Sequence, residues 1–334
     1  MKQLIITGPK QANFDDLEMP VCAQDGVIVR ARVTAISTGT ELRVFRAIPV
    51  DEAGQFLHER MPFRLPVENG YSMVGDVIEV GADVSEFDVG DRVFASAPHG
   101  QFAAVDATQV TLLPDTIPDE EAVMLNILEV AHCALRRGDP AVGSNVAIVG
   151  QGVIGLSLTA YADAFGFRTV VVDSVVERLE VARKMGVLLA VNSSEEDRYD
   201  RIHKLFGGDG ADVTFEVTSH WSGIRTAMEM TRTDGKVVVV SRHTNVPDFN
   251  PFGHPFLGKR LNLITSYGHQ ATGSRWSRHR SFSLTVDLLA RRRLKIRPML
   301  THRFPWQELP HVYHRMDKGD PGIVGAVIDW APVD

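Results

Sequence analysis

The sequence predicts an α/β protein in which a doubly wound parallel sheet is inserted into a discontinuous, barrel-like β domain. Three observations predict this class. Short alternating runs separated by turns fill residues 1 to about 115, strand-like and helix-like segments alternate from about 118, and the tail returns to strand and turn signals. The two domains are therefore expected at 1–118 together with 297–334, and at 119–296.

The N-terminal segment has the pattern of short, bent strands. Residues 27–36 alternate between apolar and polar side chains, and 73–80 and 92–95 are further β-like runs. Glycines lie between or within these runs, at positions 70, 75, 81 and 90, where bulges or tight turns are expected. These features predict a small barrel-like sheet, in which His99 ends a strand.

After a helix-like stretch at 120–137, the central segment alternates between the apolar patterns typical of strands and of helices. The expected strands are 146–150, 169–173, 212–217, 236–241 and 261–266, and the expected helices are 153–165, 175–185 and 221–231. A last helix at 281–293 places Phe282, Val286 and Leu289 on one face. This alternation predicts a parallel sheet with helices on both faces.

The composition is that of an ordinary globular protein of about two domains. Of 334 residues, 44% are hydrophobic and 23% are charged, and the net charge of −7 argues against general nucleic-acid binding. Two distant cysteines, Cys22 and Cys133, imply no disulfide framework. We find neither the apolar core of a signal peptide nor a membrane span of ~18 apolar residues. A cytoplasmic location without membrane attachment is expected.

A glycine-rich turn is the most informative feature of the chain. Residues 146–155 read VAIVGQGVIG, so a β-branched run ends in glycines spaced G-x-G-x-x-G and a helix-compatible segment begins at once. Gly150 allows a sharp turn, Gly152 allows backbone to approach a pyrophosphate, and Gly155 allows the helix to pack on the sheet. The start of the helix also favours phosphate. The turn therefore predicts a dinucleotide site.

An acidic residue follows at the end of the next expected strand. Asp173 lies 18 residues after Gly155, where its carboxylate would accept hydrogen bonds from an adenosine ribose. A 2′-phosphate would meet this negative charge, so NAD(H) is expected rather than NADP(H). Arg178, five residues further on, favours NADP(H) instead.

Together these patterns resemble the medium-chain dehydrogenase/reductase superfamily over nearly the whole chain. The most specific element is GYSMVGDVIEVGADV at 70–84, followed by VGDRV at 89–93, whose glycines and valines fall where the zinc alcohol dehydrogenase signature has them. The resemblance implies a GroES-like (chaperonin-10-like) catalytic domain, a Rossmann domain and a nicotinamide-dependent oxidoreductase acting on a small molecule. It also implies a homodimer through the strand at 261–266.

The resemblance assigns cofactor contacts position by position. One group would hold the dinucleotide at the glycine-rich turn and the following strand, and a second group at later strand ends would cover the nicotinamide half. The first group is Gly150, Gly152, Val153, Ile154, Asp173 and Arg178, and the second is Thr218, Ser219, Ser241, Arg242, Ser266 and Tyr267.

The chain departs from the zinc-dependent members at each ligand position. Thr38, in the string ISTGTE, replaces a catalytic cysteine, and Tyr71 replaces a histidine. The third ligand would fall near Asn126, with Glu129 one helical turn away. A catalytic zinc needs about three Cys, His or carboxylate ligands, so no metal is expected. A narrower resemblance, carried by ISTGTE, GYS and AHCAL, is to a branch that includes bacteriochlorophyllide dehydrogenases, and no substrate is inferred from it.

Without a metal, a side chain must exchange the proton that accompanies hydride transfer. Thr40 aligns with a proton-relaying hydroxyl of zinc-dependent relatives, or else contacts a turn or a ribose. Tyr71 either donates a hydrogen bond to the reacting oxygen or fills the space of the metal. His132 is either a general acid/base or a satisfied helix histidine. Substrate contacts are expected from Thr38, Ser72 and Glu129.

Positive charge is concentrated at residues 275–303, which contain nine basic residues against one acid, Asp287. Either these charges form a solvated helix face, or Arg275, Trp276 and Arg280 bind an anionic or hydroxyl-rich substrate.

The expected function is zinc-independent, NAD(H)-dependent interconversion of a secondary alcohol and a ketone on a polar, cyclic or anionic metabolite. Two alternatives stay open. One is reduction of an activated C=C bond, as in zinc-free enoyl and quinone reductases, and the other is a dinucleotide-binding protein without catalysis.

Overall fold

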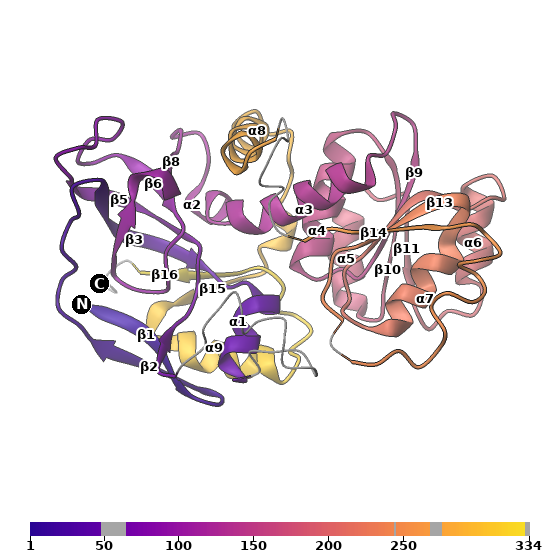
Figure 1. Ribbon diagram of the computed structural model, residues 1–334, viewed down its shortest axis with the longest axis horizontal. Coiled ribbons are helices and arrows are strands. Elements are labelled where there is room, and N and C mark those ends of the chain that lie inside the picture. Colours follow the sequence, from indigo (N-terminus) through magenta and orange to yellow (C-terminus); the bar gives the residue numbers. More distant parts are fainter. Residues whose placement is uncertain (48–64, 244, 268–275, 331–334) are drawn as a thin grey trace. The chain divides into compact units, whose positions relative to one another are not determined.

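The computed structural model describes residues 1–47, 65–243, 245–267 and 276–330 (Figure 1). The chain forms two compact units. Unit 1 consists of Met1–Asn126 with Leu300–Asp334, and unit 2 consists of Ile127–Met299. The boundaries expected from the sequence, after residues 118 and 296, lie a few residues earlier.

Seven strands form the larger sheet of unit 1, in the order β15-β16-β3-β5-β6-β8, with β7 paired to β3. Two register shifts, between Ile28 and Val29 and between Ala31 and Val33, interrupt the antiparallel pairing of β3 with β5. Such bulges bend a sheet, which agrees with the bent β domain predicted from the short runs. The strands are β3 (Gly26–Ala35), β5 (Met73–Val80), β6 (Arg92–Ala95), β7 (Phe102–Asp106), β8 (Val110–Leu112), β15 (His302–Pro305) and β16 (Ala326–Asp329).

A three-stranded sheet in the order β2-β1-β4 and several short helices complete unit 1. Its buried apolar cluster includes Leu4, Phe45, Met73, Tyr313 and Ile328, so residues from both ends of the chain share one core. The remaining elements are β1 (Lys2–Gly8), β2 (Gln11–Asp16), β4 (Val67–Glu68), α1 (Thr38–Phe45), η1 (Ala107–Gln109), α2 (Asp119–Ala122), η3 (Trp306–Glu308) and α9 (Leu309–Asp317).

Unit 2 contains a six-stranded parallel sheet in the order β11-β10-β9-β12-β13-β14 (Figure 1). The first strand therefore lies in the middle and the chain winds outward in both directions, which is the doubly wound order of dinucleotide-binding sheets. The strands are β9 (Asn145–Val149), β10 (Arg168–Asp173), β11 (Leu189–Asn192), β12 (Ala211–Glu216), β13 (Thr231–Val239) and β14 (Asn262–Thr265).

Three helices of unit 2 pack against neighbouring strands of this sheet. Helix α4 contacts β9 and β10, α5 contacts β10 and β11, and α7 contacts β9, β12 and β13. The fold class predicted from the sequence is confirmed. The helices are α3 (Leu125–Gly138), which begins at the end of unit 1, α4 (Val153–Ala164), α5 (Val176–Lys184), α6 (Arg198–Leu205), α7 (Trp221–Met230), α8 (Arg278–Ala290) and η2 (Arg297–Met299).

The structure corrects several predicted elements. The helix expected at 120–137 is divided into α2 and α3, and β11 and α6 lie in a stretch for which no element was predicted. The tail holds α9 as well as strands, because Leu309, Val312, Tyr313 and Met316 present one buried helical face. Among the described residues, no helix is long and apolar enough to cross a membrane.

Candidate active site

The glycine-rich turn joins β9 to α4 in the way its sequence requires. Gly150 has a φ of +99°, and a Cβ on Gly155 would lie 1.9 Å from the carbonyl oxygen of Gly150, so only glycine permits this contact between strand end and helix. A Cβ on Gly152, by contrast, would meet no atom within 4 Å. The backbone there borders open space at the N-terminus of α4, beside Val153 and Ile154. This opening suits a diphosphate.

The carboxylate of Asp173 lies beside this turn, at the end of β10. Its two oxygens accept hydrogen bonds from the backbone N–H groups of Gln151, at 2.5 Å, and Val175, at 2.8 Å. These contacts fix the orientation of the acid that the sequence assigns to an adenosine ribose. In α5, the Nε of half-buried Arg178 has no hydrogen-bond partner in the described part of the chain. The turn, the acid and this unsatisfied donor together fit an adenine dinucleotide.

A buried carboxylate that the sequence analysis did not single out organises the loops after β12 and β13. Glu216 accepts hydrogen bonds from the backbone N–H of Thr218, at 2.6 Å, and from Ser241 Oγ, at 2.6 Å. His243 Nε2 lies 2.8 Å from the same carboxylate. Burial alone would raise the pKa of Glu216, but these hydrogen bonds outweigh it and lower the pKa. The available signal was an acid that directly ends a buried β run.

The residues expected to cover the nicotinamide half meet at these strand ends. Ser219 has a φ of +64° and donates its backbone N–H to Ser241 Oγ at 2.9 Å. Arg242 donates to the Tyr267 hydroxyl at 2.6 Å, and Ser266 is buried. Since parallel strands end at one edge of a sheet, these side chains lie at the same edge as the glycine-rich turn.

In unit 1, hydrogen bonds link two of the three positions that hold metal ligands in zinc-dependent relatives, Tyr71 and Asn126. The Tyr71 phenol donates to Ser37 Oγ. The Asn126 amide donates to the Tyr71 carbonyl at 2.5 Å and to Ser72 Oγ at 3.4 Å. Thr38 and Thr40 lie half-buried at the start of α1.

This donor set does not fit zinc. It offers a hydroxyl, a phenol and an amide whose nitrogen is directed at a carbonyl, whereas zinc is held by thiolate, imidazole or carboxylate. Over the described ranges, no group of three or more His, Cys, Asp or Glu side chains is placed to hold a metal ion.

A buried network lies next to this cluster. The Glu41 carboxylate accepts hydrogen bonds from the Ser37 N–H, at 2.7 Å, and from the Tyr313 hydroxyl, and it lies 2.9 Å from His99 Nε2. His99 Nδ1 lies 2.7 Å from Thr34 Oγ1, which accepts the indole N–H of Trp330 at 2.9 Å. With His99 Nε2 donating to Glu41 and Nδ1 accepting from the Thr34 hydroxyl, each of these groups has a partner.

The network corrects the prediction for His99. It does not end a strand, because it lies in the connection between β6 and β7 and is fully buried. Burial and the charge of Glu41 raise the pKa of Tyr313, which therefore stays protonated and donates to the carboxylate. Glu41 is held as a structural acid that orients the backbone of Ser37.

His132 is buried in unit 2, at 2% exposure. Its Nδ1 lies 3.2 Å from Ser281 Oγ, and its ring packs against Tyr161 and Trp276. Burial, followed by the charge of Arg136, lowers the pKa of His132 to about 4. The imidazole is therefore neutral at physiological pH.

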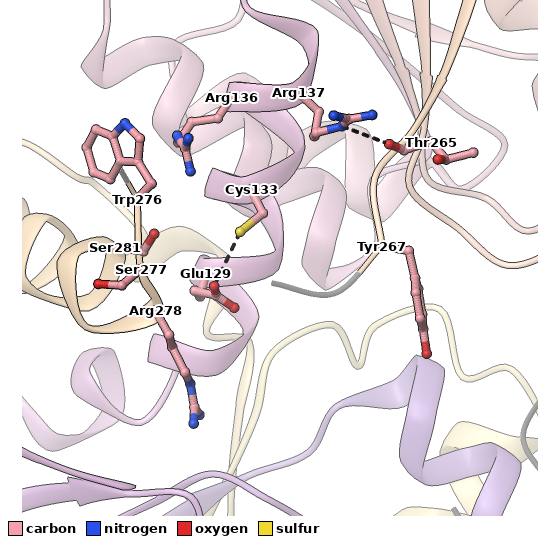
Figure 2. Close-up of a pocket in the computed structure, with 10 residues that line it drawn as sticks. All are labelled: Glu129, Cys133, Arg136, Arg137, Thr265, Tyr267, Trp276, Ser277, Arg278 and Ser281. Carbon is pink, nitrogen blue, oxygen red and sulfur yellow. Dashed lines mark hydrogen bonds between the residues drawn. The ribbon is translucent and has the colours of Figure 1, made fainter. Parts of the chain in front are cut away.

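Two of the substrate candidates of unit 2 border one pocket (Figure 2). Glu129 and Trp276 line a cavity of about 370 Å³. The guanidinium of Arg280 lies 4.3 Å from the ring centre of Trp276. Arg275 lies outside the described residues.

Comparison with known proteins identifies dehydrogenase domains in both units. Residues 23–113 match the alcohol dehydrogenase GroES-like domain, and residues 153–291 match the zinc-binding dehydrogenase family. The chain is 28% identical over 302 residues to sorbitol dehydrogenase of Bacillus subtilis. The aligned region covers 80% of this chain and 81% of the relative.

Solved structures share the fold over nearly the full length. Galactitol-1-phosphate dehydrogenase from Escherichia coli superposes with a TM-score of 0.84 at 18% identity, covering 99% of this chain and 100% of the other. A short chain alcohol dehydrogenase from E. coli CFT073, complexed with the cofactor NADH, gives 0.81 at 20% identity, covering 99% of both chains. At these identities the likeness shows the fold alone.

The fold and the glycine-rich site define a dehydrogenase that uses a nicotinamide adenine dinucleotide. The chain belongs to the medium-chain dehydrogenase/reductase superfamily, as the resemblance implied.

Proposed function

We propose that the protein is a zinc-independent, NAD(H)-dependent dehydrogenase that interconverts a secondary alcohol and a ketone on a polar small molecule. The observation that supports this proposal is the chemistry of the three ligand positions. Thr38, Tyr71 and Asn126 offer a hydroxyl, a phenol and an amide where a metal would need thiolate, imidazole or carboxylate, and Asn126 donates its amide hydrogen to the Tyr71 carbonyl. The alcohol class is supported by the relatives, which include a sorbitol dehydrogenase.

The preference for NAD(H) rests on Asp173. Its carboxylate is fixed by two backbone N–H groups, which supports its proposed role as the acceptor for the ribose hydroxyls. A 2′-phosphate at this position would bring two negative charges together, which costs several kcal/mol when they are partly buried. Replacing Asp173 with Ser should raise the affinity for NADPH relative to NADH by more than about ten-fold.

When bound, the dinucleotide supplies the hydride acceptor or donor. The chain must then orient the substrate and exchange a proton. The Tyr71 phenol is our first candidate for this exchange, because its hydrogen bond to Ser37 sets its orientation and the Asn126 amide holds its backbone. Thr40, on the first turn of α1, is the second candidate. The burial and low pKa of His132 support a core role for this histidine.

The function is tested by kinetics with both cofactors on secondary alcohols and on enones. The proposal expects NAD⁺-linked oxidation of alcohols and little reduction of C=C bonds. Turnover of enones alone would assign the reductase alternative, and NADH binding without any turnover would assign a non-catalytic role. The Asp173→Ser variant, tested beside the parent, shows whether cofactor choice follows the carboxylate.

We further propose a cytoplasmic homodimer formed through β14. This strand is an edge of the six-stranded sheet over the described residues, and Leu263 on it is 37% exposed. An open edge with an apolar side chain favours pairing with a second strand. Light scattering after size exclusion should give twice the chain mass, and Leu263→Lys should yield monomer. A monomeric parent protein would reject the dimer.

A further inference from the structure

The pocket of unit 2 is built mainly from one face of α3 and from the first turn of α8. Glu129, Cys133, Arg136 and Arg137 come from α3, while Trp276, Ser277, Arg278 and Ser281 come from the opposite wall. In Figure 2, Arg137 points toward Thr265, whose carbonyl it contacts at 3.1 Å through Nε, and Cys133 points toward Glu129. The remaining lining residue is Tyr267.

Positive charge predominates among the residues that line this pocket. Three arginines, Arg136, Arg137 and Arg278, and one acid, Glu129, line the pocket. Cys133 adds no negative charge, since burial and the nearby Glu129 raise the pKa of its thiol to about 12. The pocket therefore holds an excess of cations that the protein has partly removed from water.

Arg136, which lines the pocket, is held at a cost that an anion would relieve. The guanidinium of Arg136 lies 4.6 Å from the ring centre of Trp276, and that of Arg280 lies 4.3 Å from the same ring. Burial lowers the pKa of Arg136, with an opposing effect of Cys133 and a smaller lowering effect of the charge of Arg280. Stacking on an indole offsets part of this desolvation, but a bound anion would offset more.

The pocket is separate from the expected diphosphate position. It borders the carboxyl end of β14 at Thr265 and Tyr267, whereas the glycine-rich turn follows β9. Three strand-to-strand steps, from β9 through β12 and β13 to β14, separate the two by about 14 Å. Tyr267 belongs both to this pocket and to the residues expected to border the nicotinamide half, so a ligand here would lie toward the reacting end of the cofactor.

We propose that this pocket binds the anionic group, a carboxylate or a phosphate ester, of a hydroxylated substrate, with Arg136 and Arg278 as its main contacts. Arginine suits both groups because its planar fork matches two oxygens of either one. Ser277 and Ser281 supply hydroxyl groups on the same wall. The proposal rests on the proposed dehydrogenase function, since it assigns the charge of that enzyme's substrate.

Isothermal titration of the full chain, saturated with NADH, tests the pocket without requiring turnover. The probes are inorganic phosphate, D-gluconate and the uncharged D-sorbitol, at constant ionic strength. Saturable binding of at least one anionic probe, absent for sorbitol and weakened about ten-fold or more by Arg136→Gln and Arg278→Gln, is the expected result. Phosphate and gluconate compared with each other distinguish the two anion types.

Arg291→Gln is the matched control, because Arg291 lies exposed at the C-terminal end of α8 in an ion pair with Asp287, outside the pocket. Its anion binding should equal that of the parent, and the NADH affinity of all variants should be unchanged. No saturable anion binding, or equal binding in Arg136→Gln, would overturn the proposal. Alcohol turnover measured in the same samples separates the two ideas: turnover without anion binding rejects the pocket, and anion binding without turnover rejects the function. Circular dichroism of each variant shows whether it has folded.

Discussion

The dinucleotide site of unit 2 and the buried network of Glu41, His99 and Tyr313 in unit 1 are built in different ways. The first is local: a single stretch from β9 to the end of β10 contains its glycines, its helix start and its acid. The second is assembled from distant positions, since Glu41, His99 and Tyr313 meet only in the folded chain. A local site depends on backbone geometry, whereas an assembled site depends on satisfied buried polar groups.

Breaking the backbone geometry should have the largest effect. In Gly155→Ala the new Cβ would lie 1.9 Å from the Gly150 carbonyl oxygen, so strand end and helix must separate. We expect a loss of about 3 kcal/mol or more in the free energy of unfolding, with NADH binding abolished. Urea unfolding and NADH fluorescence measure both.

Gly152→Ala is its matched control, because a Cβ there meets no atom within 4 Å. This variant should keep the parent stability and lose only NADH affinity, since the methyl group occupies the path of the diphosphate. Equal destabilisation by the two substitutions would show that close packing is not what the third glycine provides.

Removing a partner from the buried network of unit 1 should lower the free energy of unfolding nearly as much. Glu41→Ala removes a buried carboxylate and leaves the donors of Ser37 and Tyr313 without their acceptor. Removing one partner from such a network costs about 3–5 kcal/mol. Urea unfolding should show this loss, whereas Glu18→Gln, on the exposed surface, should be neutral. A loss below about 1 kcal/mol for Glu41→Ala would contradict the claim that the buried donors of this network depend on the Glu41 carboxylate.

The buried imidazole of unit 2 makes stability depend on pH. His132 has a pKa of about 4 in the folded chain, below the ordinary value of 6.5. The unfolded chain therefore binds a proton that the folded chain does not, so stability rises with pH between about 4 and 6.5 and falls by about 3 kcal/mol as the pH is lowered through this window.

His132→Gln should remove that part of the pH dependence, measured as the urea midpoint between pH 4 and pH 7. His279→Gln, with its side chain exposed in α8, should retain it. If both variants keep the pH dependence of the parent's urea midpoint, His132 is not the source of that dependence.

Removing a single hydroxyl should have the smallest effect on the fold and a selective effect on rate. Tyr71→Phe keeps the ring and removes the donor to Ser37. If the phenol exchanges the proton, kcat should fall by about 100-fold while the NADH affinity stays at the parent value. Stopped-flow and steady-state kinetics distinguish this result from a change in KM alone, which would assign Tyr71 to substrate packing.

The same contrast explains how much could be predicted from the sequence. Helix α4 and strand β10 were predicted to within one residue, because glycine spacing and β-branched runs are local signals. His99 was misread and the Glu216–His243 pair was overlooked, because their partners lie 58 and 27 residues away. Helix α1 was also missed, since Gly39 in its first turn weakens the helical signal.

The candidate site was predictable as a set of residues but not as an arrangement. The family resemblance pointed to Thr38, Tyr71 and Asn126, yet the bond from Tyr71 to Ser37 depends on the fold of unit 1. The basic residues near 278 were visible as a charge run, while their grouping around Trp276 with Arg136 required the tertiary structure.

The proposed function requires that hydride is exchanged beside protein hydroxyl groups with no coordinated metal ion. Metal analysis of purified, active protein, combined with assays before and after a strong chelator, tests this most directly. We predict full NAD⁺-linked activity with no stoichiometric metal and no effect of the chelator. One zinc per chain, with activity lost on chelation and restored by adding zinc back, would contradict it.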